Sequence, residues 1–199
     1  MKTRYMKHIL FFAVILNVLV SCKKDRTDPV PDTDPEMIYM DLKDSAIYFN
    51  KAAFFDFDGD RQKDIYFGTM LVGDPVMQAD KKQWLVMSSF YSNLPVNGNE
   101  NIPVLNVSDP IPVQTFSGYN WYNASSVLLT QKVITNHAGS YWLGEWRNAS
   151  HQFIPFQIIR STGLFNGWVE VSFDMDSEKL LLHKAAVSRE PYRLVKAGN

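Results

Sequence analysis

Residues 166–175 read NGWVEVSFDM, and the alternation of residue types in this stretch indicates the fold class. Trp168, Val169, Val171 and Phe173 are interleaved with polar side chains along most of its length. Successive side chains of a β-strand point to opposite faces, so the pattern predicts a strand with one dry face and one solvated face. Antiparallel sheets are commonly built from strands of this kind.

Short segments of similar composition recur along the chain after residue 36. They are rich in Val, Ile, Tyr, Phe and Trp and are separated by clusters of Gly, Asn, Pro and Asp. We expect strands at residues 37–42, 46–50, 64–72, 83–91, 125–135, 140–146, 152–160, 167–174, 179–187 and 192–195. No helical period and no repeat of about 20 to 50 residues interrupts them. The sequence therefore predicts an all-β chain in which residues 37–199 form a single antiparallel β-sandwich of jelly-roll type.

The N-terminus has the pattern of a secretion signal. A basic start is followed by an apolar run from Ile9 to Val20 and then by Ser21 and Cys22, which is the only cysteine of the sequence. An apolar run of this length is too short for a membrane-spanning helix and is typical of a signal peptide. We expect residues 1–21 to be removed.

The end of this segment, LVSC, resembles the lipobox of bacterial lipoproteins. In that family the cysteine becomes the first residue of the mature chain and carries the lipid. The resemblance implies that Cys22 is lipidated and anchors the chain to the outer membrane. The lysines and aspartates after Cys22 are similar to those of Bacteroidetes-type lipoproteins that are sorted to the cell surface.

Residues 22–36 are expected to form a tether. The stretch KKDRTDPVPDTDPE, residues 23–36, contains three prolines and five acidic residues, and Val30 is its one aliphatic residue. Such a composition buries too little apolar surface to offset chain entropy.

The charge of the mature chain excludes one class of partner. Loss of the three basic residues of the signal leaves 17 Lys and Arg against 21 Asp and Glu, a net charge of -4. Nucleic-acid binding requires a basic surface, so no nucleic-acid partner is expected. The membrane, a metal ion and a glycan are the partners compatible with the sequence, which leaves the oligomeric state open.

Residues 55–68 read FDFDGDRQKDIYFG and place four aspartates within nine residues. Carboxylates this close repel one another unless solvent or a cation relieves the repulsion. Hard cations such as calcium take six to eight oxygen ligands, which a turning backbone rich in aspartate can supply. The predicted ligands are the side chains of Asp56, Asp58, Asp60 and Asp64 and the backbone carbonyl of Gln62. The alternative is a solvated turn, since Asp and Gly are common turn residues.

The pattern D-x-D-G-D-x-x-x-D-I, followed by Gly68, resembles the calcium loop of FG-GAP repeats. The resemblance implies one bound calcium ion. The chain departs from that family in two ways, because Arg61 stands where FG-GAP loops usually have glycine and because the motif occurs once. The late strand GWVEVS, with AGSYWLGEWR before it and KLLLHKAAV after it, resembles a group of secreted bacterial proteins without an established activity, which also carry an early Asp-rich loop.

Aromatic residues suggest a second site. Tyr119, Trp121 and Tyr122 lie in SGYNWYNASS, a segment rich in Gly, Asn and Ser where strand packing does not require large rings. Exposed rings of this kind stack on sugars, so a carbohydrate-binding module is the alternative function. In the competing interpretation, Trp121 folds back and covers the core.

Other residues that could carry chemistry lack the spacing that a catalytic or metal site requires. They are His137, His151, His183, Glu145, Glu170 and Glu178. No G-x-S-x-G motif is present either. We therefore expect a lipid-anchored cell-envelope β-sandwich with a structural or binding role, stabilised by one calcium ion, and not an enzyme; a glycan hydrolase is the third possibility.

Overall fold

The computed structural model describes residues 33–137 and 139–199. These residues form an all-β structure, as predicted from the sequence, with a single short 3-10 helix, η1 (Glu145–Asn148), among the described elements. The strands are β1 (Met37–Ile47), β2 (Ala53–Phe55), β3 (Ile65–Asp74), β4 (Ala79–Ser88), β5 (Ser92–Val96), β6 (Pro110–Ile111), β7 (Asn120–Tyr122), β8 (Val127–Thr135), β9 (Gly139–Leu143), β10 (Gln152–Arg160), β11 (Gly163–Asp174), β12 (Lys179–Ser188) and β13 (Val195–Lys196). No described helix has the length and hydropathy needed to span a bilayer.

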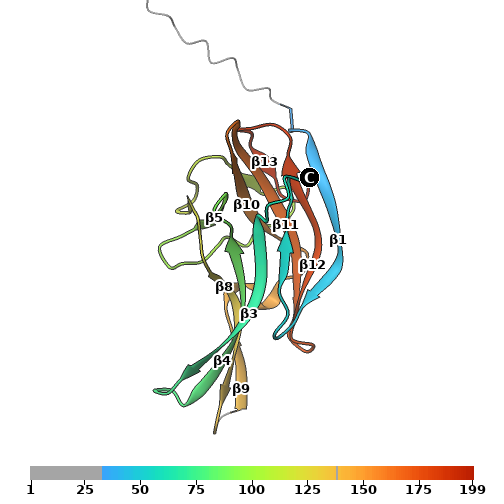
Figure 1. The fold of residues 1–199 in the computed structure, drawn as a ribbon. Helices are drawn as coiled ribbons and strands as arrows, with labels where there is room; N and C mark the ends of the chain where they lie inside the picture. The colour runs from blue at the N-terminus through green and yellow to red at the C-terminus, as the bar shows by residue number, and fades with distance from the viewer. Residues whose placement is uncertain (1–32, 138) are drawn as a thin grey trace, which may run out of the picture. The chain divides into compact units, whose positions relative to one another are not determined.

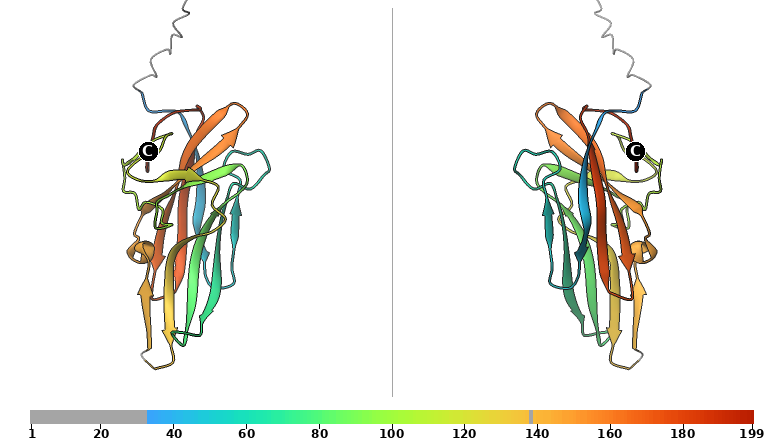
Figure 2. Two further views of the ribbon diagram at one scale, coloured as in Figure 1. Left: turned by 90° about the vertical axis from the view of Figure 1, so that its left-hand side faces the viewer. Right: turned by 90° about the vertical axis from the view of Figure 1, so that its right-hand side faces the viewer.

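Two antiparallel sheets face each other and make a β-sandwich (Figures 1 and 2). One sheet has the strand order β1-β12-β11-β10-β5-β7, and the other has the order β2-β3-β4-β8-β9. A short pair, β13-β6, forms a separate two-stranded sheet. Half of the neighbouring pairs are consecutive in the chain, namely β2-β3, β3-β4, β8-β9, β10-β11 and β11-β12.

The main core lies between the two sheets. In β11 the inward residues Val169 and Val171 are fully buried, and Phe173 packs edge-on against Trp84 of the opposite sheet at a ring distance of 5.2 Å. The dry face predicted from NGWVEVSFDM is therefore confirmed. Burial of this apolar surface is the main favourable term in the folding of such a domain.

The opposite face of β11 is only partly solvated, which differs from the sequence prediction. Trp168 is 2% exposed and packs edge-on against Phe153 at 5.2 Å. Ile111 of β6 and Val195 of β13 join them in a second, smaller apolar cluster. The long connection from β5 to β7, together with β13, packs over this half of the sheet. The sequence pattern of one strand cannot show that a distant segment buries its outer face.

Several strand boundaries also differ from the prediction. Residues 37–42 and 46–47 belong to one strand, β1, which is interrupted by a bulge between Asp41 and Ser45. The expected strand at 140–146 ends at Leu143, and that at 192–195 reduces to the short β13. Strands β2, β5, β6 and β7 were not predicted, because they are short and all but β2 contain proline or asparagine.

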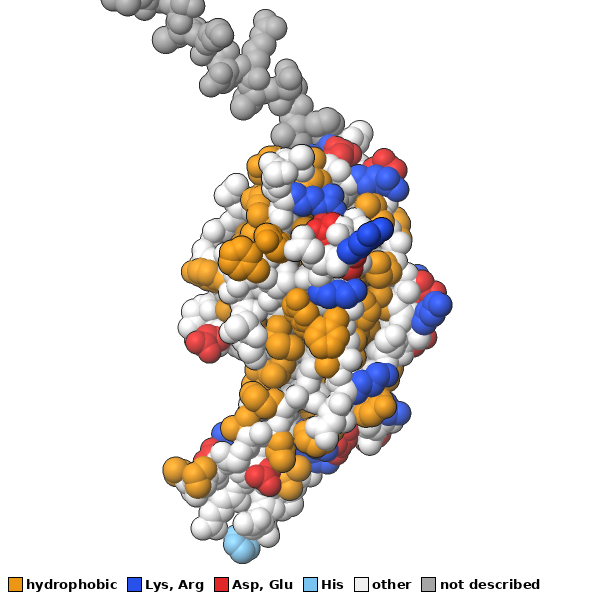
Figure 3. Space-filling model, in the orientation of Figure 1, with side chains coloured by type: hydrophobic (Ala, Val, Ile, Leu, Met, Phe, Trp, Pro, Cys, Tyr) orange, Lys and Arg blue, Asp and Glu red, His pale blue; other side chains and the backbone are white. Residues whose placement is uncertain are grey.

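The five-stranded sheet continues beyond the main core as the hairpins β3-β4 and β8-β9 (Figure 1). Hydrophobic side chains are exposed at the tip of the first hairpin (Figure 3), where Val76 and Met77 are 91% and 54% exposed. Closer to the core, Glu178 of the β11-β12 turn accepts hydrogen bonds from Lys82 at 2.5 Å and from Lys132 at 2.6 Å. This carboxylate ties the end of one sheet to the face of the other.

Candidate metal centre

The aspartates of FDFDGDRQKDIYFG lie on the connection between β2 and β3. Phe55 pairs with Ile65 across the hairpin, and the Asp64 backbone N–H donates to the Phe55 carbonyl oxygen at 2.7 Å. The predicted hairpin-like loop between two strands is confirmed. Because both flanking residues are apolar and enter the sheet, the polar residues between them are held together at its end.

Three of the carboxylates converge. One oxygen each from Asp56, Asp58 and Asp64 lies within 4.8 Å of the other two. Oxygens at this separation can contact one cation, since calcium–oxygen distances are about 2.3 to 2.6 Å. These three residues, called the aspartate triad below, could hold a metal ion.

The other two predicted ligands are not part of the aspartate triad. The Asp60 carboxylate turns toward Gln62 and accepts hydrogen bonds from its backbone N–H at 2.7 Å and from its side-chain Nε2 at 3.2 Å. The alternation of aspartates along the sequence therefore overestimates the number of carboxylates that meet.

Backbone N–H groups shape the loop around the aspartate triad. Asp56 accepts hydrogen bonds from Gly59 at 2.7 Å and from Arg61 at 2.8 Å. Both donors have positive φ angles, 76° for Gly59 and 74° for Arg61. Arg61 thus adopts the left-handed conformation that glycine favours, and the loop makes the turn despite the side chain.

Asp64 is the member of the aspartate triad whose backbone and side chain are both buried. It is 2% exposed, and one of its oxygens accepts a hydrogen bond from the Phe57 backbone N–H at 2.7 Å. Burial raises the pKa of its carboxyl to about 7, and the charges of Asp58, Asp56 and Asp60 add to the increase, against the lowering effect of the Phe57 N–H. The site therefore disfavours the ionised form of Asp64 unless a cation is present.

One cation from a distant strand already contacts the aspartate triad. Arg160, the last residue of β10, donates from Nε to Asp58 Oδ2 at 2.6 Å, and the Asp58 side chain is 1% exposed. No sequence motif links these residues, which are 102 positions apart. With Asp64 ionised, the three carboxylates and the guanidinium would carry a charge of -2, which a divalent cation would neutralise.

No family model, curated protein or solved structure matches this chain.

The three aromatic residues of the second predicted site do not share one face. Tyr122 is 54% exposed, whereas Trp121, its neighbour in β7, packs against the second apolar cluster and its Nε1 is buried. Tyr119 and Trp121 both pack against Phe116, at ring distances of 5.9 and 6.0 Å. Consecutive strand residues point to opposite sides, so the formation of β7 separates Trp121 from Tyr122.

The glutamates considered for a hydrolase each contact a different partner. Glu145 accepts a hydrogen bond from Asn101 at 3.4 Å, and Glu170 contacts His151 at 2.7 Å. Glu178 binds the two lysines described above. None of these contacts joins two of the three glutamates.

A pair of histidines meets although the sequence gives no spacing that predicts it. The rings of His151 and His183 stack with their centres 4.4 Å apart. His151 directly precedes β10 and His183 lies in β12, so only the strand order brings them together. The third histidine, His137, is exposed in the turn between β8 and β9.

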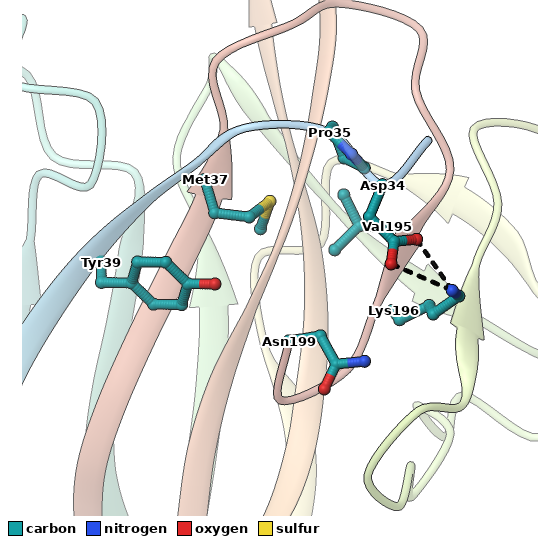
Figure 4. Close-up of a pocket in the computed structure, with 7 residues that line it drawn as sticks. All are labelled: Asp34, Pro35, Met37, Tyr39, Val195, Lys196 and Asn199. Atoms are coloured by element: carbon teal, nitrogen blue, oxygen red, sulfur yellow. Dashed lines mark hydrogen bonds and ion pairs between the residues drawn. The ribbon is translucent and has the colours of Figure 1, made fainter. Parts of the chain in front are cut away.

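A pocket of about 270 Å³ lies between the start of β1 and β13 (Figure 4). Its lining residues are Asp34, Pro35, Met37, Tyr39, Val195, Lys196 and Asn199. Lys196 Nζ lies 2.8 Å from Asp34 Oδ1 across its mouth. Residues 34 and 35 of the predicted tether thus contact the sandwich, whereas the predicted lipidation site, Cys22, lies outside the described residues.

Proposed function

We propose that this chain is a lipid-anchored cell-envelope protein with a structural or binding role, whose β2-β3 loop holds one calcium ion. The convergence of Asp56, Asp58 and Asp64 is the observation that carries the calcium assignment. Their oxygens suit a hard cation, and histidine or cysteine, which softer metals prefer, is absent from this group.

Charge and burial support the same assignment. Burial raises the pKa of the Asp64 carboxyl to about 7, and the charges of the neighbouring aspartates add to the increase. Arg160 supplies one positive charge to the loop. A divalent ion would supply the remaining two and would allow Asp64 to ionise.

Calcium binding is tested by thermal unfolding. An ion that binds the folded state alone raises stability with its concentration. For a dissociation constant of about 0.1 to 1 mM, 10 mM calcium should add about 1.4 to 2.7 kcal/mol, a shift of several degrees. Magnesium should do less, because it requires a tighter octahedral geometry. Identical melting curves in chelator and in calcium would leave the loop as a solvated turn.

Two variants and a matched control locate the ion. Asp56→Asn and Asp64→Asn should lose the calcium response, and Asp64→Asn should also be more stable than the wild type in chelator at pH 8, since it removes a buried charge. Asp60→Asn changes a carboxylate outside the aspartate triad and should retain the response. Loss of the response in Asp60→Asn alone would contradict the assignment of the ion to the triad.

The lipid anchor rests on the signal-like N-terminus and on its LVSC ending. Lipidation at Cys22 would place the sandwich at the outer membrane, with the acidic, proline-rich residues after it as a spacer. Cys22→Ser should abolish metabolic labelling with palmitate and leave the precursor uncleaved. Labelling equal to that of the wild type would overturn the anchor without affecting the calcium assignment.

A further inference from the structure

The histidine pair lies on the uncovered half of the outer face of the six-stranded sheet, where two strand registers shift at the same level. Strand β12 pairs with β11 at Lys184 and then at Leu182, so His183 is the extra residue. On the other side of β12, Lys184 pairs with Asp41 of β1, whereas Leu182 pairs with Ser45, so the register with β1 also shifts at His183. Bulges re-aim side chains and are frequent beside active sites.

The backbone around His183 is strained on both sides. Lys43 and Asp44, in the bulge of β1, have φ angles of 56° and 51°, and His151 has a φ angle of 52°. Side-chain-bearing residues rarely adopt these left-handed conformations, and those that do cluster at functional sites. Asp44 and His151 contact the His183 ring, and Lys43 directly precedes Asp44.

A continuous chain of hydrogen bonds runs through the His183 ring. Its Nδ1 lies 2.6 Å from Asp44 Oδ1, and its Nε2 lies 2.8 Å from Ser172 Oγ. An ionised Asp44 only accepts, so Nδ1 carries the proton of the neutral ring. Nε2 then accepts from the Ser172 hydroxyl. A nucleophile bonded to a base, which a third group orients, is the arrangement of nucleophilic catalysis.

We propose that Ser172, His183 and Asp44 form an acyl-transfer site that hydrolyses small carboxylic esters on this sheet face. Ser172 is the nucleophile, His183 is the general base, and Asp44 is a positioning residue that fixes the tautomer of the ring. The proposal goes beyond the calcium-dependent role above and departs from the sequence expectation of a non-enzymatic chain.

His151 completes the surroundings of the serine. Its backbone N–H donates to Ser172 Oγ at 2.9 Å, so the hydroxyl oxygen is held between this donor and His183 Nε2. Its ring is held by Glu170 at 2.7 Å and stacks on His183. The substrate class is an ester, because its leaving alcohol departs more readily than the amine of an amide. The His151 side chain is 64% exposed, and the face is open to a small substrate.

The reaction balances without a cofactor. The Ser172 O–H bond breaks as its proton moves to His183 Nε2, and Oγ bonds to the acyl carbon. The tetrahedral intermediate releases an alcohol, which takes the proton from Nε2. Water then attacks the acyl-serine by the same route and releases a carboxylic acid, which regenerates Ser172 and neutral His183.

A fluorophosphonate probe tests the nucleophile on the full mature chain. We expect one label per chain, mapped to Ser172 by mass spectrometry, and no label at this site in Ser172→Ala. His183→Gln should lower the labelling rate at least about 100-fold, the usual contribution of a general base. The exposed Ser161 is the matched control, and Ser161→Ala should label like the wild type. A folded wild-type chain in which Ser172 labels no faster than Ser161 overturns the proposal.

Asp44 gives an independent test, since its side chain is 74% exposed and its replacement should not unfold the domain. Asp44→Asn should lower the labelling rate about tenfold with an unchanged melting temperature, and Asp44→Glu should restore part of the rate. If His183→Gln does not fold, these two variants decide the question. Equal rates in wild type, Asp44→Asn and Asp44→Glu would overturn the role of the chain of hydrogen bonds.

Discussion

Gly167 shows at the scale of one residue how closely β10, β11 and β12 are packed. A methyl group at this position would lie 2.4 Å from Cζ of Phe156 and 2.5 Å from the carbonyl oxygen of Ala186. The φ angle of Gly167 is not in the left-handed region, so lack of space is the reason for glycine here. The ring of Phe156 fills the position that a side chain would take.

Gly167→Ala should therefore destabilise the domain by about 1 to 3 kcal/mol, because a carbonyl oxygen and a packed ring must both move. Chemical denaturation measures the change. Gly98 is the matched control, since a methyl group there meets nothing within 4 Å. Gly98→Ala should change the free energy of unfolding by less than about 0.5 kcal/mol. Equal effects of the two variants would contradict the packing around Gly167.

At the scale of elements, the β11-β12 turn fastens the two sheets through Glu178. The hydrogen bonds from Lys132 and Lys82 hold the pKa of the Glu178 carboxyl below its usual range. Its lowered pKa means that the folded state favours the ionised form. The stabilisation is thus fully present above the unfolded pKa of about 4.5 and is lost as pH falls through the lower folded value.

Glu178→Gln should accordingly cost about 1 kcal/mol at pH 7, the upper end for a partly exposed ion pair. The difference from the wild type should shrink below a pH of about 4, where the wild-type carboxylate takes up its proton. Urea unfolding at several pH values measures it. Asp176, exposed in the same turn, is the control, and Asp176→Asn should show no pH-dependent difference from this source. A cost for Glu178→Gln that is constant with pH would contradict the ion pair.

At the scale of the whole molecule, the last residues of the predicted tether are joined to the C-terminal segment. The Thr33 carbonyl accepts a hydrogen bond from Arg193, which is 7% exposed. Glu36 Oε1 lies 3.1 Å from Arg189 Nε, and its carbonyl accepts from the Arg189 backbone N–H at 2.8 Å. Residues 33–36 therefore contribute contacts to the sandwich, which composition alone does not reveal.

Deletion of residues 23–32 should leave the melting temperature unchanged, because their composition offers little to a core. Deletion of residues 23–36 should lower it by a few degrees, since Arg193 loses an acceptor and two surface ion pairs disappear. Differential scanning calorimetry compares the two proteins. Equal melting temperatures would show that residues 33–36 add nothing, and a large loss in the shorter deletion would contradict the tether.

The sequence by itself determined the all-β class, the dry face of β11 and the position of the aspartate loop between two strands. These features depend on residues close in sequence, since strand alternation and turn composition act over a few positions. The bulged β1 and the short strands β2, β5, β6 and β7 were not predicted, because their formation depends on partner strands.

Only the tertiary structure decided which side chains meet. It excluded Asp60 from the aspartate triad, brought Arg160 to Asp58, separated Trp121 from Tyr122, and placed His183 between Asp44 and Ser172. Each of these outcomes depends on strand order, register and bulges across the sheets. A one-residue change in register moves a side chain to the other face, so no local pattern can specify such contacts.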